Sequence, residues 1–251
     1  LGEVTAGPDG GWLPYCGAAP IPGDWLVRWN VDPLLLIGMA AAAVLLWRGA
    51  ETGGQRRLGV SAIALALLLF VTPFCALSSA LFSARVTHHV LLAAVLAPLL
   101  VYALPDRRLR LPGSLALWTG LQAVAFWLWH APALYAEALS DDLVYWLMQL
   151  TITGTALGFW AAVRRTDGLS AIAALLVSTV QMGLLGALIT FAGAPLYAPH
   201  FLTTDPWGFS PLEDQQMAGL IMWAPSAGLY LAAALFLTRR WLASEERGAA
   251  T

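Results

Sequence analysis

Long apolar segments dominate the sequence, and short polar connections between them hold most of the charged, glycine and proline residues. An α-helix crosses a bilayer with about 20 mostly apolar residues, and seven segments approach that length. They cover residues 31–47, 58–78, 87–104, 114–134, 143–163, 169–192 and 216–237. The pattern therefore predicts an all-α polytopic membrane protein, a bundle of seven transmembrane helices.

Composition agrees with this fold class. Hydrophobic residues make up 59% of the chain and charged residues 11%, and the mean hydropathy is +0.70, which is high for a soluble domain. We divide the chain into a polar amino-terminal arm (1–30), a transmembrane domain (31–240) and a short tail (241–251).

The basic residues set the expected orientation. The chain has no lysine, and eleven of its arginines fall in connections that the seven spans place on one side of the membrane. Only Arg28 and Arg85 fall on the other side. Because short cytoplasmic loops carry the excess of basic residues, we expect the amino terminus outside, in the periplasm, and the carboxyl terminus in the cytoplasm.

This topology puts all four histidines near the outer face. His88 and His89 open the third span, His130 ends the fourth, and His200 lies in the last outer loop. Cys75 and Met222 fall in the outer halves of the second and seventh spans. Imidazole, thiolate and thioether groups suit copper, with Cys and Met favouring the cuprous ion, so the outer ends of these spans are a candidate copper site.

A purely structural interpretation competes with this one, because Met often fills gaps between helices and a lone intramembrane Cys behaves as a small apolar residue. Adjacent helical residues point about 100° apart, so His88 and His89 are not expected to face one pocket together. The outer compartment permits a disulfide between Cys16 and Cys75. With one cysteine in the arm and one in a span, we expect them to be unpaired.

Several activities lack their sequence signals. The chain has no glycine-rich phosphate loop, no nucleophile elbow and no HExxH or CxxC motif, and it has no basic patch for nucleic acid. No charged residue falls in the middle of a predicted span, which argues against an ion-coupled transporter. We therefore expect a protein that is not an enzyme.

Five stretches carry a resemblance to a known family. They are FSARVTHHVLLAAVLAPLLV, FWLWHAPALYAEAL, VYWLMQLTITGTALGFW, PLYAPH and LEDQQMAGLIMWAP. Together they resemble the CtaG family of seven-helix cytochrome c oxidase assembly proteins, over nearly the whole chain from about residue 31. The resemblance implies a role in maturing a haem-copper oxidase in the bacterial inner membrane, with oxidase subunits as partners and copper as the metal.

The resemblance also implies site residues. His89 matches the family's histidine before a leucine-rich run, His130 its WH motif, and Asp214, Gln215, Met222 and Trp223 its DQ…MW motif. We take His89 and His130 as the expected copper ligands, with His88, Cys75 and Met222 as further candidates. Asp214, Gln215 and Trp223 are expected to support the ligands.

The chain departs from the family pattern at two places. Arg85 and Val86 stand where His-Met is typical, and Gln149 stands where a histidine is typical. The alternative function is therefore a non-catalytic accessory subunit that binds a respiratory or other membrane complex without metal.

Overall fold

A computed structural model describes residues 14–166 and 168–249, so the first 13 residues of the arm lie outside it. All regular structure within these ranges is helical. The α-helices are α1 (Pro33–Gly49), α2 (Gly53–Phe70), α3 (Pro73–Ala80), α4 (Phe82–Leu91), α5 (Ala97–Ala103), α6 (Leu115–Trp129), α7 (Pro132–Ala138), α8 (Asp142–Arg165), α9 (Gly168–Thr190) and α10 (Pro211–Ala249). A π-helical turn, η2 (Leu92–Leu96), joins α4 to α5, and short 3-10 turns are η1 (Trp25–Val27), η3 (Asp106–Arg108), η4 (Ala198–His200) and η5 (Asp205–Trp207).

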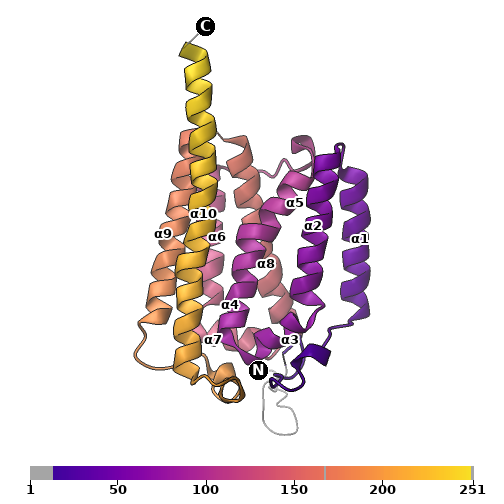
Figure 1. Cartoon of the computed structure of the whole chain (residues 1–251), viewed down its shortest axis with the longest axis vertical. Helices are drawn as coiled ribbons and strands as arrows, with labels where there is room; N and C mark the ends of the chain where they lie inside the picture. Colours follow the sequence, from indigo (N-terminus) through magenta and orange to yellow (C-terminus); the bar gives the residue numbers. More distant parts are fainter. Residues whose placement is uncertain (1–13, 167, 250–251) are drawn as a thin grey trace.

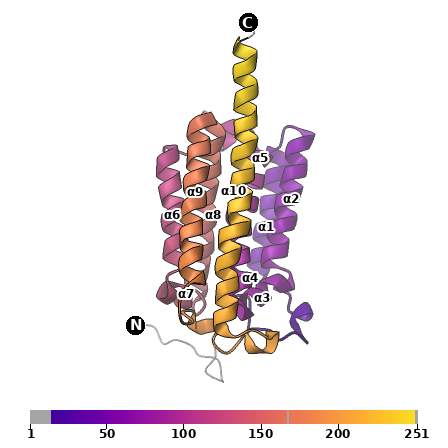
Figure 2. The ribbon, with the colours of Figure 1, turned by 60° about the vertical axis from the view of Figure 1, so that its left-hand side comes forward.

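The long helices lie roughly side by side in one bundle, with α1 at an edge next to α2 and with α10 reaching beyond the other helices (Figure 1). Turning the molecule shows α9 and α10 running together along the bundle (Figure 2). They approach closely because Gly186 and Gly219 face each other there, and a Cβ on Gly219 would lie 2.6 Å from the Gly186 carbonyl oxygen. The third and seventh predicted spans also pack together, as α4 against α10.

Each of the seven apolar segments is helical, but not all are long unbroken spans. Four helices of the described residues are long and apolar enough to cross a membrane: 82–103, 142–165, 168–190 and 211–243. The pair α2 and α3 gives a fifth if it counts as one span bent by 47°. The remaining two, α1 and α6, are apolar but have only 17 and 15 residues.

Prolines explain where the predicted segments break. The predicted span 58–78 is divided at Pro73, which begins α3, while the Thr72 hydroxyl accepts a hydrogen bond from the Phe74 amide. The span 114–134 ends at Trp129, because Ala131 precedes Pro132 and adopts an extended conformation. Pro98 is the second residue of α5, which follows the π-helical turn in the third span. The breaks at Pro73 and Pro132 lie near histidines, since Phe74 packs near His88 and His130 ends α6.

Two boundaries differ from the sequence expectation. The third helical run begins at Phe82 rather than at residue 87, so Arg85 lies inside a helix. The last helix begins at Pro211 and continues to Ala249, so the predicted tail 241–251 is helical as far as the structure describes it.

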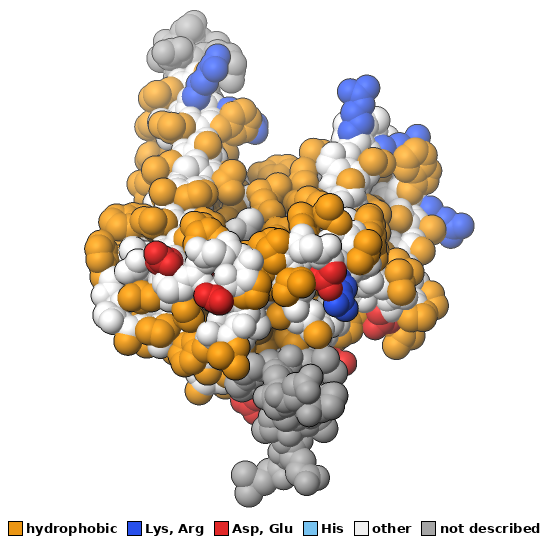
Figure 3. Space-filling model, turned by 60° about the horizontal axis from the view of Figure 1, so that its bottom comes forward, with side chains coloured by type: hydrophobic (Ala, Val, Ile, Leu, Met, Phe, Trp, Pro, Cys, Tyr) orange, Lys and Arg blue, Asp and Glu red, His pale blue; other side chains and the backbone are white. Residues whose placement is uncertain are grey.

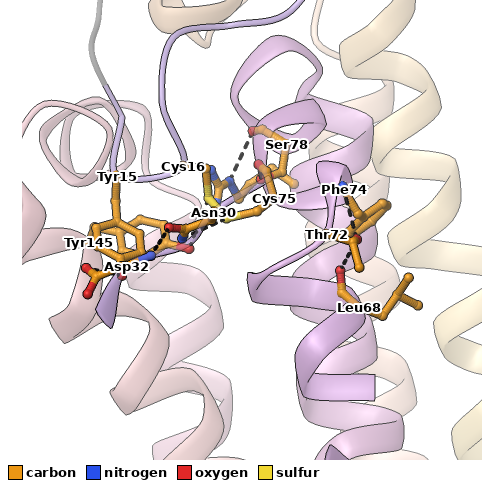
Figure 4. The surroundings of a disulfide bond; sticks show 11 residues. Tyr15, Cys16, Asn30, Asp32, Leu68, Thr72, Phe74, Cys75, Ser78 and Tyr145 are labelled. Carbon is orange, nitrogen blue, oxygen red and sulfur yellow. Dashed lines mark hydrogen bonds between the residues drawn. A yellow bond between two sulfur atoms is a disulfide. The ribbon is translucent and has the colours of Figure 1, made fainter. Parts of the chain in front are cut away.

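The arm is attached to the bundle by a disulfide bond between Cys16 and Cys75, which corrects our expectation that the two cysteines are unpaired. Figure 4 shows this bond between the arm and α3. The ring of Tyr15 stacks on Tyr145 of α8 with centroids 5.0 Å apart, and its hydroxyl donates to Asp32, the cap of α1. Part of the arm is therefore a fixed component of the end of the bundle at which α1 begins.

Candidate functional site

Two of the predicted ligands, His89 and His130, lie side by side inside the bundle. His89 projects from α4, and His130 is the residue that ends α6. Their ring centroids are 5.4 Å apart with the ring planes at 89°, and their exposed fractions are 0% and 3%. Two imidazoles that share one metal ion, each with a nitrogen about 2 Å from it, have centroids about 5 to 6.5 Å apart. The pair is thus close enough to share an ion.

A hydrogen bond from the His130 ring fixes which of its two nitrogens is unprotonated. Its Nδ1 lies 2.7 Å from the carbonyl oxygen of Phe126, so this nitrogen carries the proton and donates it. Nε2 of His130 and both ring nitrogens of His89 are buried and have no protein partner among the described residues. A metal-binding histidine usually donates a hydrogen bond from its other ring nitrogen to a carbonyl or carboxylate oxygen, and this bond fixes the tautomer and the orientation of the ring. His130 therefore presents an unprotonated Nε2 to the interior.

His88 faces a different group of side chains. Its ring makes an edge contact with Phe70 of α2 at 4.8 Å and lies 6.2 Å from Phe74 of α3. The centroids of His88 and His89 are 6.0 Å apart, in the T-shaped arrangement expected for neighbours on a helix. The structure places His88 toward α2 and α3, and His89 toward α6.

Cys75 has no thiolate in this structure, because its sulfur is bonded to Cys16. A disulfide sulfur is not a thiolate ligand, so our expectation that Cys75 binds copper does not hold for this oxidised form. Cys75 instead joins the arm to α3, close to the Ser78 turn that Figure 4 shows.

Met222 lies on the buried stripe of α10, with Ala218 and Ser226, and its exposed fraction is 0%. The carboxylate of Asp214, eight residues earlier on α10, accepts a hydrogen bond from the backbone amide of Phe82 at the start of α4. Both helices run away from this contact, and His89 is seven residues beyond Phe82. With about 1.5 Å of rise per residue, Met222 and His89 lie at similar depths, about 10 to 12 Å from the contact.

The three expected supporting residues have different surroundings. Asp214 is buried and caps α4, since its carboxylate accepts hydrogen bonds from the Phe82 amide, at 2.6 Å, and from the Ser83 amide and hydroxyl. Gln215 accepts from the Leu196 amide and donates to the carbonyl of Ile189, so it holds the α9–α10 connection. Trp223 is 43% exposed and packs near Gly183 and Gly186 of α9. Only Asp214 supports the helix that carries the histidines.

Comparison with protein families gives one match. The model of the cytochrome c oxidase caa3 assembly factor family (Caa3_CtaG) matches residues 39–244, which is most of the chain and contains every histidine discussed above. The chain belongs to this family of oxidase assembly factors. Comparisons with curated proteins and with solved structures gave no match.

In this assembly factor, His200 is a structural residue outside the histidine pair. Its Nδ1–H donates to the carbonyl of Ala80 at 3.2 Å, and its Nε2 accepts from the hydroxyl of Tyr135 at 2.7 Å. Burial lowers the pKa of His200 to about 3, so it is neutral near pH 7. Tyr197 completes the arrangement by donating its hydroxyl to the carbonyl of His130 at 2.9 Å. The sequence analysis did not single out either tyrosine, although Tyr135 is the last residue of the WHAPALY stretch and Tyr197 lies within PLYAPH.

Arg85 is the unusual member of the assembly factor's interior. Its exposed fraction is 0%, its Nε donates to the carbonyl of Ser78 at 3.2 Å, and its guanidinium lies 5.3 Å from the centre of the Tyr145 ring. Nη1 and Nη2 are buried with no hydrogen-bond partner in the described part of the chain. A guanidinium close to the histidines opposes the entry of a second cation.

The number of donors limits the type of metal site. Within residues 14–166 and 168–249, no group of three or more His, Cys, Asp and Glu side chains is arranged to hold a metal ion. The assembly factor therefore offers two close imidazoles, with Met222 at a similar depth on the adjacent helix. Two or three soft or intermediate donors suit a cuprous ion better than zinc, which almost always takes four ligands.

Proposed function

We propose that this chain holds a cuprous ion at His89 and His130 and supplies it to a haem-copper oxidase during assembly. Family membership supports the role in oxidase assembly. The observation that carries the copper part is the pair of buried imidazoles, with ring centroids 5.4 Å apart, in which Nε2 of His130 and both nitrogens of His89 have no hydrogen-bond partner among the described residues.

The proposal includes a topology of seven crossings. The helices α1 and α6 are short, but each is continued by ordered chain at the outer end, through the Asp32 cap of α1 and through α7 after α6. The arginines of the α1–α2, α5–α6 and α8–α9 connections lie at the end of the bundle opposite the arm. Figure 3 views the arm end, with acidic side chains near the viewer and most arginines at the far end. We assign the arginine-rich end of the bundle to the cytoplasmic side of a bacterial inner membrane.

Two features of the chain prepare the histidines for a cargo ion. The Phe126 carbonyl keeps the proton of His130 on Nδ1, so the Nε2 lone pair is available without deprotonation. The Asp214 carboxylate holds the first turn of α4 and thereby fixes the height of His89. A site with few ligands releases its ion more readily than a closed four-ligand site, which suits a donor.

Metal binding by the purified chain tests this proposal. The protein in detergent is loaded with cuprous ion under reducing conditions, and bound copper is measured by competition with a chromophoric chelator. We expect about one copper per chain, lost in His89→Ala with His130→Ala, and unchanged in Met217→Leu, since Met217 is 39% exposed and away from the buried stripe. Stoichiometric binding by the double variant would reject this ligand pair.

A metal-free accessory role is the second candidate, and Arg85 favours it. A fixed positive charge beside His88 and His89 weakens the binding of any cation in the same interior. If the wild-type chain binds no copper but copurifies in a fixed ratio with an oxidase, the accessory role replaces the copper proposal. Arg85→Gln distinguishes the two, because removing the charge strengthens copper binding only if the histidines are ligands.

A further inference from the structure

A lateral pocket lies between α1, α2, α5 and α8, apart from the His89 and His130 pair. Its volume is about 480 Å³, within the range of sites for small molecules. Most of its lining is aliphatic, and Phe70 and Trp146 supply aromatic surface. Two lining residues, Leu34 of α1 and Leu150 of α8, are 80% and 65% exposed, so the pocket opens between these helices. In a membrane this opening faces lipid.

The pocket contains one polar group that is not explained by the fold. Gln149 lines it and is 1% exposed, and neither its amide oxygen nor its amide nitrogen has a hydrogen-bond partner in the described structure. An unpaired buried amide costs about 1 to 3 kcal/mol for each group left unsatisfied. The Gln149 amide nitrogen can donate a hydrogen bond to a carbonyl oxygen, and its amide oxygen can accept one from a hydroxyl group. The amide therefore favours an occupant that carries a carbonyl or a hydroxyl group.

The position of Gln149 restricts the occupant. It is seven residues into α8, or about 10 Å from the outer start of that helix, which is deeper than the headgroup layer of a bilayer. A phospholipid acyl chain has no polar group at that depth. A transmembrane helix of a partner does not fit either, because a 15 Å length of a helix about 10 Å wide occupies about 1,200 Å³.

The arm contributes to the outer end of the pocket. Tyr15 and Asp32, joined by a 2.8 Å hydrogen bond, line it there. The disulfide of Cys16 keeps the neighbouring Tyr15 in place (Figure 4). The exposed side chains of Leu34 and Leu150 place an opening on the membrane side, which a lipid-soluble molecule can enter.

We infer that this pocket binds a lipid-soluble ring compound that carries a carbonyl or hydroxyl group, the chemistry of isoprenoid quinones, with the polar group on Gln149. The rings of Phe70 and Trp146 are nearly parallel, with centroids 5.8 Å apart, and this aromatic pair gives a planar ring a surface to pack against, while the aliphatic wall from α1 suits an apolar tail. Phe70 also contacts His88, so the occupied pocket adjoins the histidine interior.

Photolabelling tests this inference. The full-length protein in quinone-free phospholipid nanodiscs is irradiated with a diazirine derivative of a decyl benzoquinone, and labelled peptides are mapped by mass spectrometry. We expect label on α1 and α8, removed by excess unlabelled decyl benzoquinone and not by excess palmitoyl lysolipid. Equal removal by the lysolipid would mean that the pocket takes acyl chains and would overturn the inference.

Two variants and one control make the test specific. Gln149→Leu should weaken binding about tenfold, the effect of one lost hydrogen bond to a buried amide. Gly38→Phe should abolish labelling without unfolding the protein, because a Cβ at Gly38 meets nothing within 4 Å and Gly38 lines the pocket. Gln181→Leu, on α9 and outside the pocket, should label like the wild type. Unchanged labelling in both pocket variants, with normal thermal unfolding, would refute the site.

Discussion

The carboxylate of Asp214 connects the last helix to the helix that carries the histidines, and its loss should weaken both fold and site. In Asp214→Ala, the amides of Phe82 and Ser83 lose their acceptor, as does the Ser83 hydroxyl. Loss of a helix cap costs about 1 to 2 kcal/mol, and a buried amide left unpaired costs about 1 to 3 kcal/mol. Removal of a buried carboxylate recovers part of this, so we expect a net loss of about 2 to 4 kcal/mol.

The assay is thermal unfolding of the detergent-purified protein, followed by tryptophan fluorescence. At about 2 to 4 °C per kcal/mol for a chain of this size, the midpoint should fall by about 5 to 15 °C. Asp214→Asn retains one acceptor and should lose about half as much. Its neighbour Glu213 is the matched control, because it is exposed and its carboxylate accepts from the amide and hydroxyl of Ser210, the residue directly before α10.

The reasoning is wrong if Asp214→Ala unfolds at the same temperature as Glu213→Gln. The same variants also test the link to the site. Because His89 is two turns beyond Ser83 on α4, Asp214→Ala should reduce cuprous affinity, whereas Glu213→Gln should not.

Three further predictions concern stability. Replacing Cys16 and Cys75 by Ser should cost about 4 kcal/mol by the chain-entropy relation for the 59-residue separation; an unchanged unfolding midpoint in the oxidised and reduced protein would contradict this. His200 stays neutral when folded, with a pKa of about 3, but titrates near 6.5 when unfolded, so lowering the pH from 7 to 5 should remove about 2 kcal/mol of stability through this residue. The pH dependence should be smaller by that amount in His200→Gln, and an identical pH profile would show that the residue is not the source. Gly219→Ala should cost about 1 to 3 kcal/mol because its Cβ would lie 2.2 Å from the Thr190 hydroxyl oxygen, whereas Gly228→Ala, with nothing within 4 Å, should not destabilise.

The positions of the helices follow from the sequence because apolar length alone marks a helix that lies in lipid. The segment 143–163 corresponds to α8 within two residues at each end, and 31–47 corresponds to α1 equally well. Helix ends were less predictable. The stretch FSARV, residues 82–86, was predicted to precede the third span, yet it forms the first half of α4, whose first turn is capped by Asp214, 131 residues away from Ser83.

The site was partly predictable. The different directions of His88 and His89 follow from helix geometry, and the structure confirms them, since His88 contacts Phe70 and His89 contacts His130. The placement of the histidines on the outer side of the membrane stays a prediction. The ligand roles stay a prediction. The disulfide was not expected, because an arm 59 residues away from Cys75 gives no sign in the sequence of folding back onto α3. The amide of Gln149 could be recognised only once the pocket that it lines was visible.

Copper in the finished oxidase tests the central claim most directly. The oxidase is purified from cells whose only copy of this assembly factor is wild type, His89→Ala with His130→Ala, or Met217→Leu, and its copper and haem are measured per molecule. We predict normal haem and reduced copper with the double variant, and normal values for both with Met217→Leu. An oxidase with its full copper content from cells that carry the double variant at wild-type levels would contradict the account.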